Sequence, residues 1–211
     1  MTAQSEASGR VARFVRCMAD IDGSKSRTEV FRDFCELAFC TLAKTAAQNA
    51  EEAERREANY MEVVGRYRNK DDVRKMPELL SMAVLALNLG GIDFLGRVAG
   101  EIGALDSDMG QFFTPYEISR LNAEMSLGDA RGIVAEHGFL TLGEPAAGAG
   151  CMVIAAADTL EAQGIDPARQ LWVEAVELNR STFHMCYIQT ALRGIAGVVI
   201  HGNSLSLERF D

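Results

Sequence analysis

The alternation of short apolar runs with helical patterns in the second half of the chain constrains the fold most strongly. Apolar runs at 139–142, 171–176 and 198–200 each end in a turn, and stretches typical of helices separate them at 152–163 and 181–193. Strands that alternate with helices through short turns form parallel sheets with right-handed crossovers. The pattern therefore predicts an α/β fold with a parallel, doubly wound sheet.

The first half of the chain has a helical pattern. Residues 28–66 are rich in Ala, Leu, Glu, Lys and Arg and contain no proline, and apolar residues recur there at intervals of three and four. Pro77 is typical of a helix start, and the glycine pair at 90–91 is typical of a helix end. A short helix is expected to follow Asp93 and to end near residues 106–108.

The charge differs between the two halves of the chain. The chain contains 21 Lys+Arg and 30 Asp+Glu, for a formal net charge of −9. Residues 1–105 contribute −1 and residues 106–211 contribute −8. We therefore expect a helical N-terminal region over residues 1–105 and a partial α/β domain over residues 106–211. The acidity argues against a generic basic nucleic-acid binder, so any contact with DNA would come from the N-terminal helices or from a partner.

The composition is that of a soluble globular protein, with 48% hydrophobic and 24% charged residues. No apolar run reaches the roughly 18–20 residues of a membrane span, and the N-terminus lacks the apolar segment of a signal peptide, so we expect no membrane partner and a cytoplasmic location. The five cysteines contain no C-x-x-C pair and the three histidines are scattered. This distribution predicts reduced thiols and no metal site.

A glycine turn follows the first predicted strand, at the edge where parallel sheets bind ligands. It contains Glu144, Gly148 and Gly150, and the G-x-G spacing lets the backbone turn sharply and approach a ligand. A dinucleotide fingerprint needs a third glycine where this chain has Val153, so a nicotinamide dinucleotide enzyme is a weak alternative. The carboxylate of Glu144, just before the glycines, suits a cationic ligand better than a pyrophosphate. An ordinary tight turn is the other interpretation.

Polar residues also follow the second and third predicted strands. Glu177 lies 27 residues beyond Gly150, where an acidic side chain can accept hydrogen bonds from ribose hydroxyls. Asn203 has an amide that can read the edge of a purine ring. The alternatives are a solvated glutamate and a residue that caps a turn. With the glycine turn, these residues predict an adenosine-type ligand with a positive charge, which S-adenosylmethionine fits better than NAD.

The hexapeptide GQFFTP at 110–115 precedes the turn E-P-x-x-G-x-G at 144–150. Over residues 93–205, this combination resembles the N6-adenine DNA methyltransferases that form the modification subunits of type I restriction-modification systems. The resemblance implies a helical N-terminal domain and a Rossmann-like methyltransferase domain that binds S-adenosylmethionine. It further implies that Thr114 and Pro115 hold the methionine end of that cofactor.

The same resemblance implies roles for five further residues. Glu144, Gly148 and Gly150 match the loop under the amino-acid moiety of the cofactor, with Glu in place of the commoner Asp. Glu177 matches the carboxylate that binds the ribose. Asn203 matches a position that is usually Asp and contacts the adenine amine, so purine recognition would be weaker in this chain.

The catalytic tetrapeptide of that family, N/D-P-P-Y/F, is absent, because none of the four prolines is adjacent to another. In the family this tetrapeptide binds the target amine and stacks on the flipped base. We therefore assign no catalytic residue and expect a protein that binds S-adenosylmethionine but is not catalytically self-sufficient. The alternative is a non-catalytic protein derived from the family, which acts as the partner of a methyltransferase or modulates restriction.

One edge of the predicted sheet needs a cover. The third predicted strand lies close to Asp211, so we expect these residues to form only the first half of the family's sheet. In the family's strand order the first strand is central, and residues 139–142 would then present an unpaired apolar edge, which proteins normally cover. We expect the N-terminal helices, a second copy of the chain or a strand from a partner protein to cover it.

Overall fold

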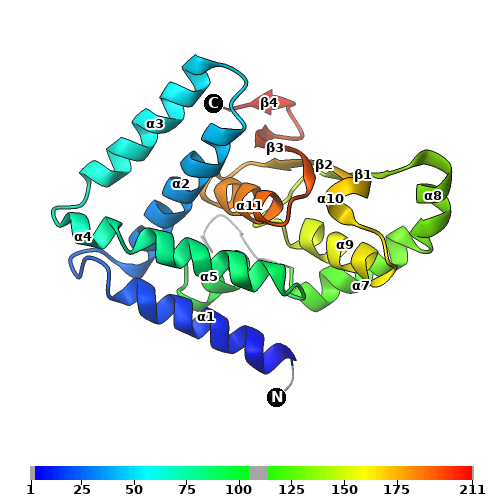
Figure 1. Ribbon diagram of the computed structural model, residues 1–211, viewed down its shortest axis with the longest axis horizontal. Helices are drawn as coiled ribbons and strands as arrows, with labels where there is room; N and C mark the ends of the chain where they lie inside the picture. Colours follow the sequence, from blue (N-terminus) through cyan, green and yellow to red (C-terminus); the bar gives the residue numbers. More distant parts are fainter. Residues whose placement is uncertain (1–2, 105–113, 211) are drawn as a thin grey trace.

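The first part of the molecule is helical, as predicted. The computed structural model describes residues 3–104 and 114–210. Its first part consists of helices that lie together on one side of the molecule (Figure 1). They are α1 (Ala3–Ala19), α2 (Arg27–Thr45), α3 (Ala50–Gly65), α4 (Lys70–Val73), α5 (Met76–Asn88) and α6 (Phe94–Glu101).

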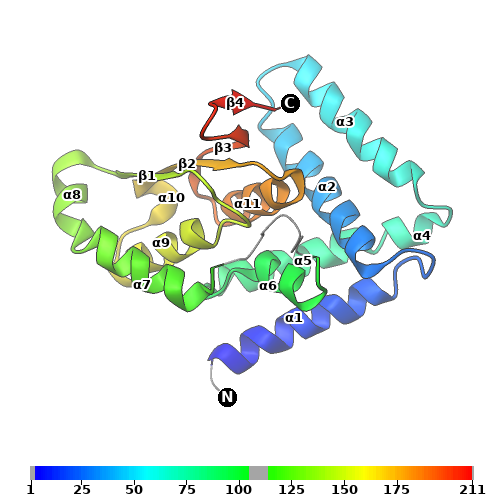
Figure 2. The same cartoon turned by 180° about the vertical axis from the view of Figure 1, so that it is seen from behind.

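The second part is the predicted parallel sheet with its helices. Its elements are α7 (Tyr116–Leu127), α8 (Ala130–His137), β1 (Leu140–Glu144), α9 (Cys151–Ala162), α10 (Pro167–Gln170), β2 (Leu171–Glu177), α11 (Arg180–Leu192), β3 (Ala196–Asn203) and β4 (Glu208–Arg209). The strand order is β1-β2-β3-β4, and β1, β2 and β3 are mutually parallel. Helices α9 and α11 lie on the same face of the sheet (Figures 1 and 2).

Several element bounds differ from the sequence prediction. Strands β1 and β3 run further than expected, so that Glu144 and Asn203 are the last residues of their strands rather than turn residues. The short β4 pairs antiparallel with β3 and was not predicted. The helical pattern of 28–66 is two helices, because Asn49 interrupts it: its side chain accepts a hydrogen bond from the N–H of Glu52 at 2.8 Å and caps α3.

One hydrophobic core joins the helical part to the sheet. Phe14 of α1 packs edge-on against Phe34 and Phe94, with ring centroids 5.3 and 5.4 Å apart. Phe183 and Ile188 of α11 belong to the same cluster of buried residues. Since α11 also packs on β2 and β3, it connects the N-terminal helices to the sheet, and those helices lie on the β3 side (Figure 2).

Of the three covers expected for the β1 edge, the N-terminal helices do not supply one in the described part of the chain. In the described residues β1 pairs on one side only, with β2, and its other main neighbours are α8 and α9. Thr141 and Gly143 are exposed, and the side chain of Phe139 just before the strand is 50% exposed. The helices pack instead against α11, because its apolar residues extend their core. Among residues 3–104 and 114–210, no other strand pairs with this edge of β1.

Candidate functional site

The turn after β1 is held in one conformation by backbone hydrogen bonds. Glu144 ends β1, and its Oε1 accepts the N–H of Ala146 at 3.1 Å. The N–H of Ala147 donates to the carbonyl of Val176 at 2.9 Å, which ties the turn to β2. The N–H of Gly150 donates back to the carbonyl of Ala147 at 2.8 Å. The turn thus lies against the carboxyl end of β2, where the sheet predicts a ligand.

Both glycines of the turn adopt conformations that other residues avoid. Gly148 has a φ of 55° and Gly150 a φ of 96°. A Cβ atom on Gly150 would lie 3.1 Å from the Sγ of Cys186 and 3.3 Å from its Cα, so α11 leaves no room for a side chain. Helix α9 begins directly after Gly150 and has no side-chain cap. Its first N–H groups are therefore directed at the turn without a side-chain acceptor.

Glu177 lies beside the glycine turn, as the strand pattern predicted, and it is not the solvated glutamate of the alternative interpretation. Its side chain is buried at the end of β2, and its Oε2 accepts the N–H of Gly148 at 2.7 Å. Its Oε1 accepts the N–H of Asn179 and the hydroxyl of Thr182, both at 2.8 Å. Three donors thus fix the carboxylate beside the turn, and a carboxylate has about four acceptor positions.

Asn203 lies at the end of β3 and caps the turn toward β4. Its Oδ1 accepts the N–H groups of Leu205 at 2.9 Å and Ser206 at 3.3 Å. In the β2–β3 register Glu177 is opposite His201, so Asn203 lies two residues beyond the end of β2. Within the described residues no hydrogen bond joins Asn203 to the glycine turn.

Thr114 and Pro115 lie just before α7, and both are exposed. Residues 110–113 of the GQFFTP motif fall outside the described residues. The carbonyl of Pro115 accepts the N–H groups of Ile118 and Ser119, which starts α7. Helix α7 packs along α9, the helix that follows the glycine turn. The motif therefore continues into a helix that supports the turn from the side.

A buried network that the sequence analysis missed supports the turn from below. Gln189 of α11 is fully buried; its Nε2 donates to the carbonyl of Ala149 and to Oδ1 of Asp93, both at 2.7 Å, and its Oε1 accepts the N–H of Leu95. Asp93 caps α6 through the N–H of Gly96 at 3.0 Å. Burial raises the pKa of the Asp93 carboxyl. The capping position of Asp93 was recognisable in the sequence, but its partner 96 residues away was not.

The described residues contain neither a metal-binding cluster nor a membrane-spanning helix. Within these residues no group of three or more His, Cys, Asp and Glu side chains is arranged to hold a metal ion. Nor does any helix there combine the length and hydropathy that crossing a bilayer requires.

A match to a protein family agrees with the resemblance seen in the sequence. The family model "N-6 DNA Methylase" matches residues 95–211, which is more than half of the chain. No curated protein matches the sequence. Two solved structures resemble the chain. One is a protein assigned as a class I S-adenosylmethionine-dependent methyltransferase from Listeria monocytogenes, with 15% identity and a TM-score of 0.46. The other is the methyltransferase subunit of a type I restriction-modification system from Streptococcus thermophilus, with 14% identity and a TM-score of 0.44. The matches cover 95% and 97% of this chain, but only 54% and 59% of those two chains.

Proposed function

The chain belongs to the N-6 DNA methylase family, and from that premise we propose that it binds S-adenosylmethionine at the carboxyl ends of β1 and β2. The main support is the 2.7 Å hydrogen bond between the carboxylate of Glu177 and the N–H of Gly148. It brings the acidic residue and the glycine turn to one place, although they lie 29 residues apart. Ligands of parallel sheets bind at this edge.

Each residue of the site then has a role that its chemistry allows. Glu144 attracts the positively charged amino-acid end of the cofactor. Gly148 lets the ligand approach the backbone, because it has no side chain, and Gly150 lets α11 pack closely beneath the turn. Glu177 uses its remaining acceptor capacity for the ribose hydroxyls. Asn203 already accepts two N–H groups through Oδ1, so its amide Nδ2 is the group that remains to donate to a purine ring nitrogen.

Thr114 and Pro115 complete the proposed site on the α7 side. They match the family residues that hold the methionine end, and α7 packs on the helix that begins at the glycine turn. The cofactor, when bound, supplies an activated methyl group. The chain has no N/D-P-P-Y/F tetrapeptide to hold a target adenine, so we propose that it does not methylate DNA without a partner.

Calorimetric titration with S-adenosylmethionine tests this proposal. We expect one site per chain, and binding at least ten-fold weaker in Glu144→Ala and Glu177→Ala. Glu174→Ala is the matched control, because Glu174 is an exposed glutamate of the same strand β2. Absence of binding to the folded chain, or equal binding by all three variants, would refute the proposed site. Methyl transfer to adenine-containing duplex DNA by the chain alone would refute the dependence on a partner.

The open edge of β1 favours a second candidate function, that of a non-catalytic interaction or regulatory protein. Edge strands of this kind pair with other chains unless they are covered. A second copy of the chain or a strand from another protein could add to β1 and extend the sheet. Light scattering after size exclusion distinguishes the two functions when it is combined with the titration. A stable assembly without cofactor binding would favour the second candidate.

A further inference from the structure

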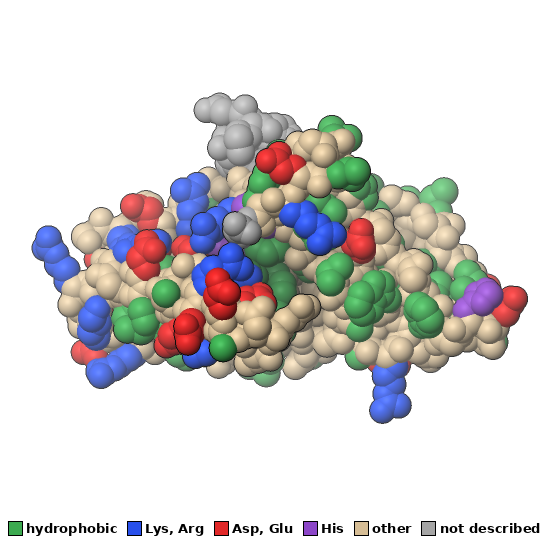
Figure 3. All heavy atoms as spheres, turned by 90° about the horizontal axis from the view of Figure 1, so that it is seen from above, with side chains coloured by type: hydrophobic (Ala, Val, Ile, Leu, Met, Phe, Trp, Pro, Cys, Tyr) green, Lys and Arg blue, Asp and Glu red, His purple; other side chains and the backbone are tan. Residues whose placement is uncertain are grey.

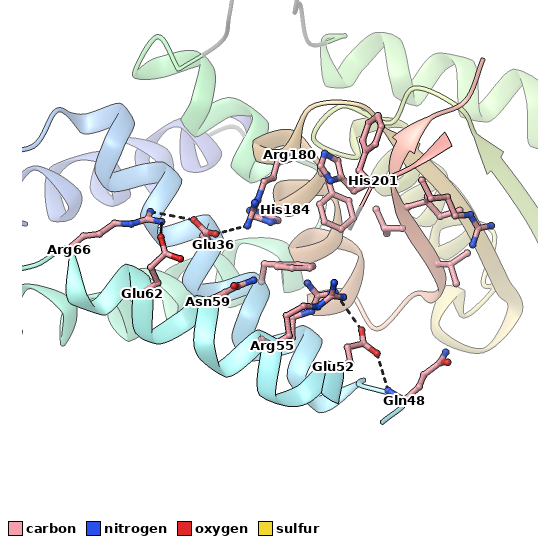
Figure 4. Close-up of a pocket in the computed structure, with 18 residues that line it drawn as sticks. Glu36, Gln48, Glu52, Arg55, Asn59, Glu62, Arg66, Arg180, His184 and His201 are labelled. Atoms are coloured by element: carbon pink, nitrogen blue, oxygen red, sulfur yellow. Dashed lines mark hydrogen bonds and ion pairs between the residues drawn. The ribbon is translucent and has the colours of Figure 1, made fainter. Parts of the chain in front are cut away.

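A groove of about 910 Å³ lies between the N-terminal helices and the outer edge of the sheet, away from the glycine turn. One wall is formed by α2 and α3, and the other by β3, β4 and the start of α11 (Figure 4). Its volume is in the range of ligand pockets. Seen from above, the surface is hollowed near its middle, and Lys and Arg side chains gather around the hollow (Figure 3).

The charge of the groove is opposite to that of the chain. Five arginines and three glutamates line it, whereas the net charge of the whole chain is −9. The three glutamates are all paired with arginines of the groove: Glu36 with Arg66 and Arg180, Glu52 with Arg56, and Glu62 with Arg66. The side chains of Arg55 on α3 and Arg209 on β4 have no hydrogen-bond or ion-pair partner within the described residues. Each of these guanidinium groups, on opposite walls of the groove, is therefore available to an anionic group.

The floor of the groove is built from stacked aromatic rings. His184 stacks on Phe39 with centroids 4.4 Å apart, and His201 stacks on Phe183 at 5.2 Å. Phe210 meets the ring of His201 edge-on at 5.1 Å. Burial lowers the pKa of His184 to about 3, so its ring is neutral at physiological pH. Phe210 and His201 are only partly buried and offer ring surface to a ligand.

Arg56 joins the basic and aromatic features of the groove. Its guanidinium lies over the ring of Phe39, with Cζ 4.8 Å from the ring centroid. Its Nε is buried without a hydrogen-bond partner. Buried donors without a partner cost stability, so this one is available for an acceptor that enters the groove.

We propose that this groove binds a nucleotide unit, with the phosphate at Arg55 and Arg209 and the base on the aromatic floor near Phe210. Guanidinium groups bind phosphate, and aromatic rings stack on bases of any sequence; together they form the usual site for single-stranded nucleic acid. The site does not rest on the proposed cofactor site, because it uses none of the same residues. A free nucleotide and one unit of a single strand share this chemistry.

Fluorescence anisotropy with a fluorescein-labelled twelve-residue thymidine oligonucleotide tests the proposal on the whole chain without S-adenosylmethionine. We expect saturable binding that is weakened five-fold or more by Arg55→Gln and by Arg209→Gln. Each substitution should lower the dependence of log affinity on log salt by about one. Phe210→Leu keeps the apolar volume but removes the stacking ring, so a five-fold or greater loss is expected there too. Arg131→Gln, on exposed α8, is the matched control for a lost charge.

Competition identifies the source of the ligand. Displacement of the label by thymidine monophosphate would assign the groove to free nucleotides, and displacement only by unlabelled oligonucleotide would assign it to a strand; both support the proposal. Equal displacement by inorganic phosphate or by polyglutamate would overturn it, because a charge-only surface needs no base. No binding, or binding that Arg55→Gln and Arg209→Gln leave unchanged, would also overturn it. Cofactor binding, measured separately, is expected to be unaffected by both substitutions.

Discussion

The carboxylate of Glu177 accepts a hydrogen bond from the N–H of Gly148 at 2.7 Å, and this contact places the end of β2 against the turn after β1. The same carboxylate accepts the N–H of Asn179 and the hydroxyl of Thr182. One buried side chain therefore orders both the glycine turn and the start of α11. The proposed cofactor site depends on this order, because a ligand would meet groups already held in place.

Glu177→Gln should destabilise the fold. The glutamine side chain keeps one acceptor oxygen, but an NH2 group replaces the other. At least one donor that now bonds to Glu177 would then lose its acceptor. An unsatisfied buried donor costs roughly 1–3 kcal/mol, and we expect a loss of this size in the free energy of unfolding. Urea unfolding followed by circular dichroism measures it. Glu174→Gln, on the exposed face of the same strand, should change stability by less than about 0.5 kcal/mol; an equal loss in both variants would contradict the account.

Gly150→Ala should destabilise the fold by more than about 1 kcal/mol, because φ is 96° there and the new Cβ would press on Cys186. Gly143→Ala is the matched control in the preceding strand: its φ is ordinary and no atom lies within 4 Å of the added carbon. We expect that change to be neutral or slightly stabilising. Thermal unfolding of the two variants compares them directly. If Gly150→Ala unfolded at the same temperature as Gly143→Ala, that result would contradict the close packing of α11 against the turn.

Asp93→Asn tests the buried network under the turn. Burial raises the pKa of the Asp93 carboxyl, against the opposing effect of hydrogen bonds from Gln189 and from the N–H of Gly96. A raised pKa in the folded state means that the contribution of the carboxyl to stability is greatest below its ordinary value of 3.8 and falls as the pH rises above it. Asn keeps the acceptor and does not titrate. The stability of the wild type relative to Asp93→Asn should therefore fall with rising pH above 3.8; a constant difference would contradict this assignment.

His184→Phe tests the buried imidazole on the floor of the groove. Its pKa is lowered to about 3, mainly by burial and further by Arg180 and His201. At pH values below 6.5, the ordinary pKa of histidine, the unfolded chain takes up a proton that the folded chain does not. The free energy of unfolding therefore falls as the pH is lowered from about 6.5 to about 3. The slope that His184 contributes to the free energy of unfolding against pH approaches about 1.4 kcal/mol per pH unit. Phe keeps a ring against Phe39 and should remove this part of the slope, and an unchanged slope in urea unfolding would count against a buried neutral His184.

The sequence predicted the features that depend on neighbouring residues. Apolar runs and glycine turns identified the three parallel strands, because both strand pattern and turn conformation are local properties. The contact of Gln189 with Asp93 depends on packing between distant segments, so no local pattern indicated it. The strand ends did predict that Glu177 and the glycine turn share one edge of the sheet, but not the hydrogen bond between Glu177 and Gly148. The break at Asn49 was missed because the helical composition continues on both sides of it. The aromatic groove was missed for the same reason as the network: α2, α3 and β3 meet only in the fold.

Hydrogen–deuterium exchange with and without S-adenosylmethionine tests the central claim most directly, because it reports where a ligand acts. We expect slower exchange on addition of the cofactor at the amides of residues 144–151 and 177–182, and no change in α2 and α3. The protection should be lost in Glu177→Ala and kept in Glu174→Ala. Unchanged exchange at the glycine turn under saturating cofactor, or protection confined to the helical region, would contradict a cofactor site at the ends of β1 and β2.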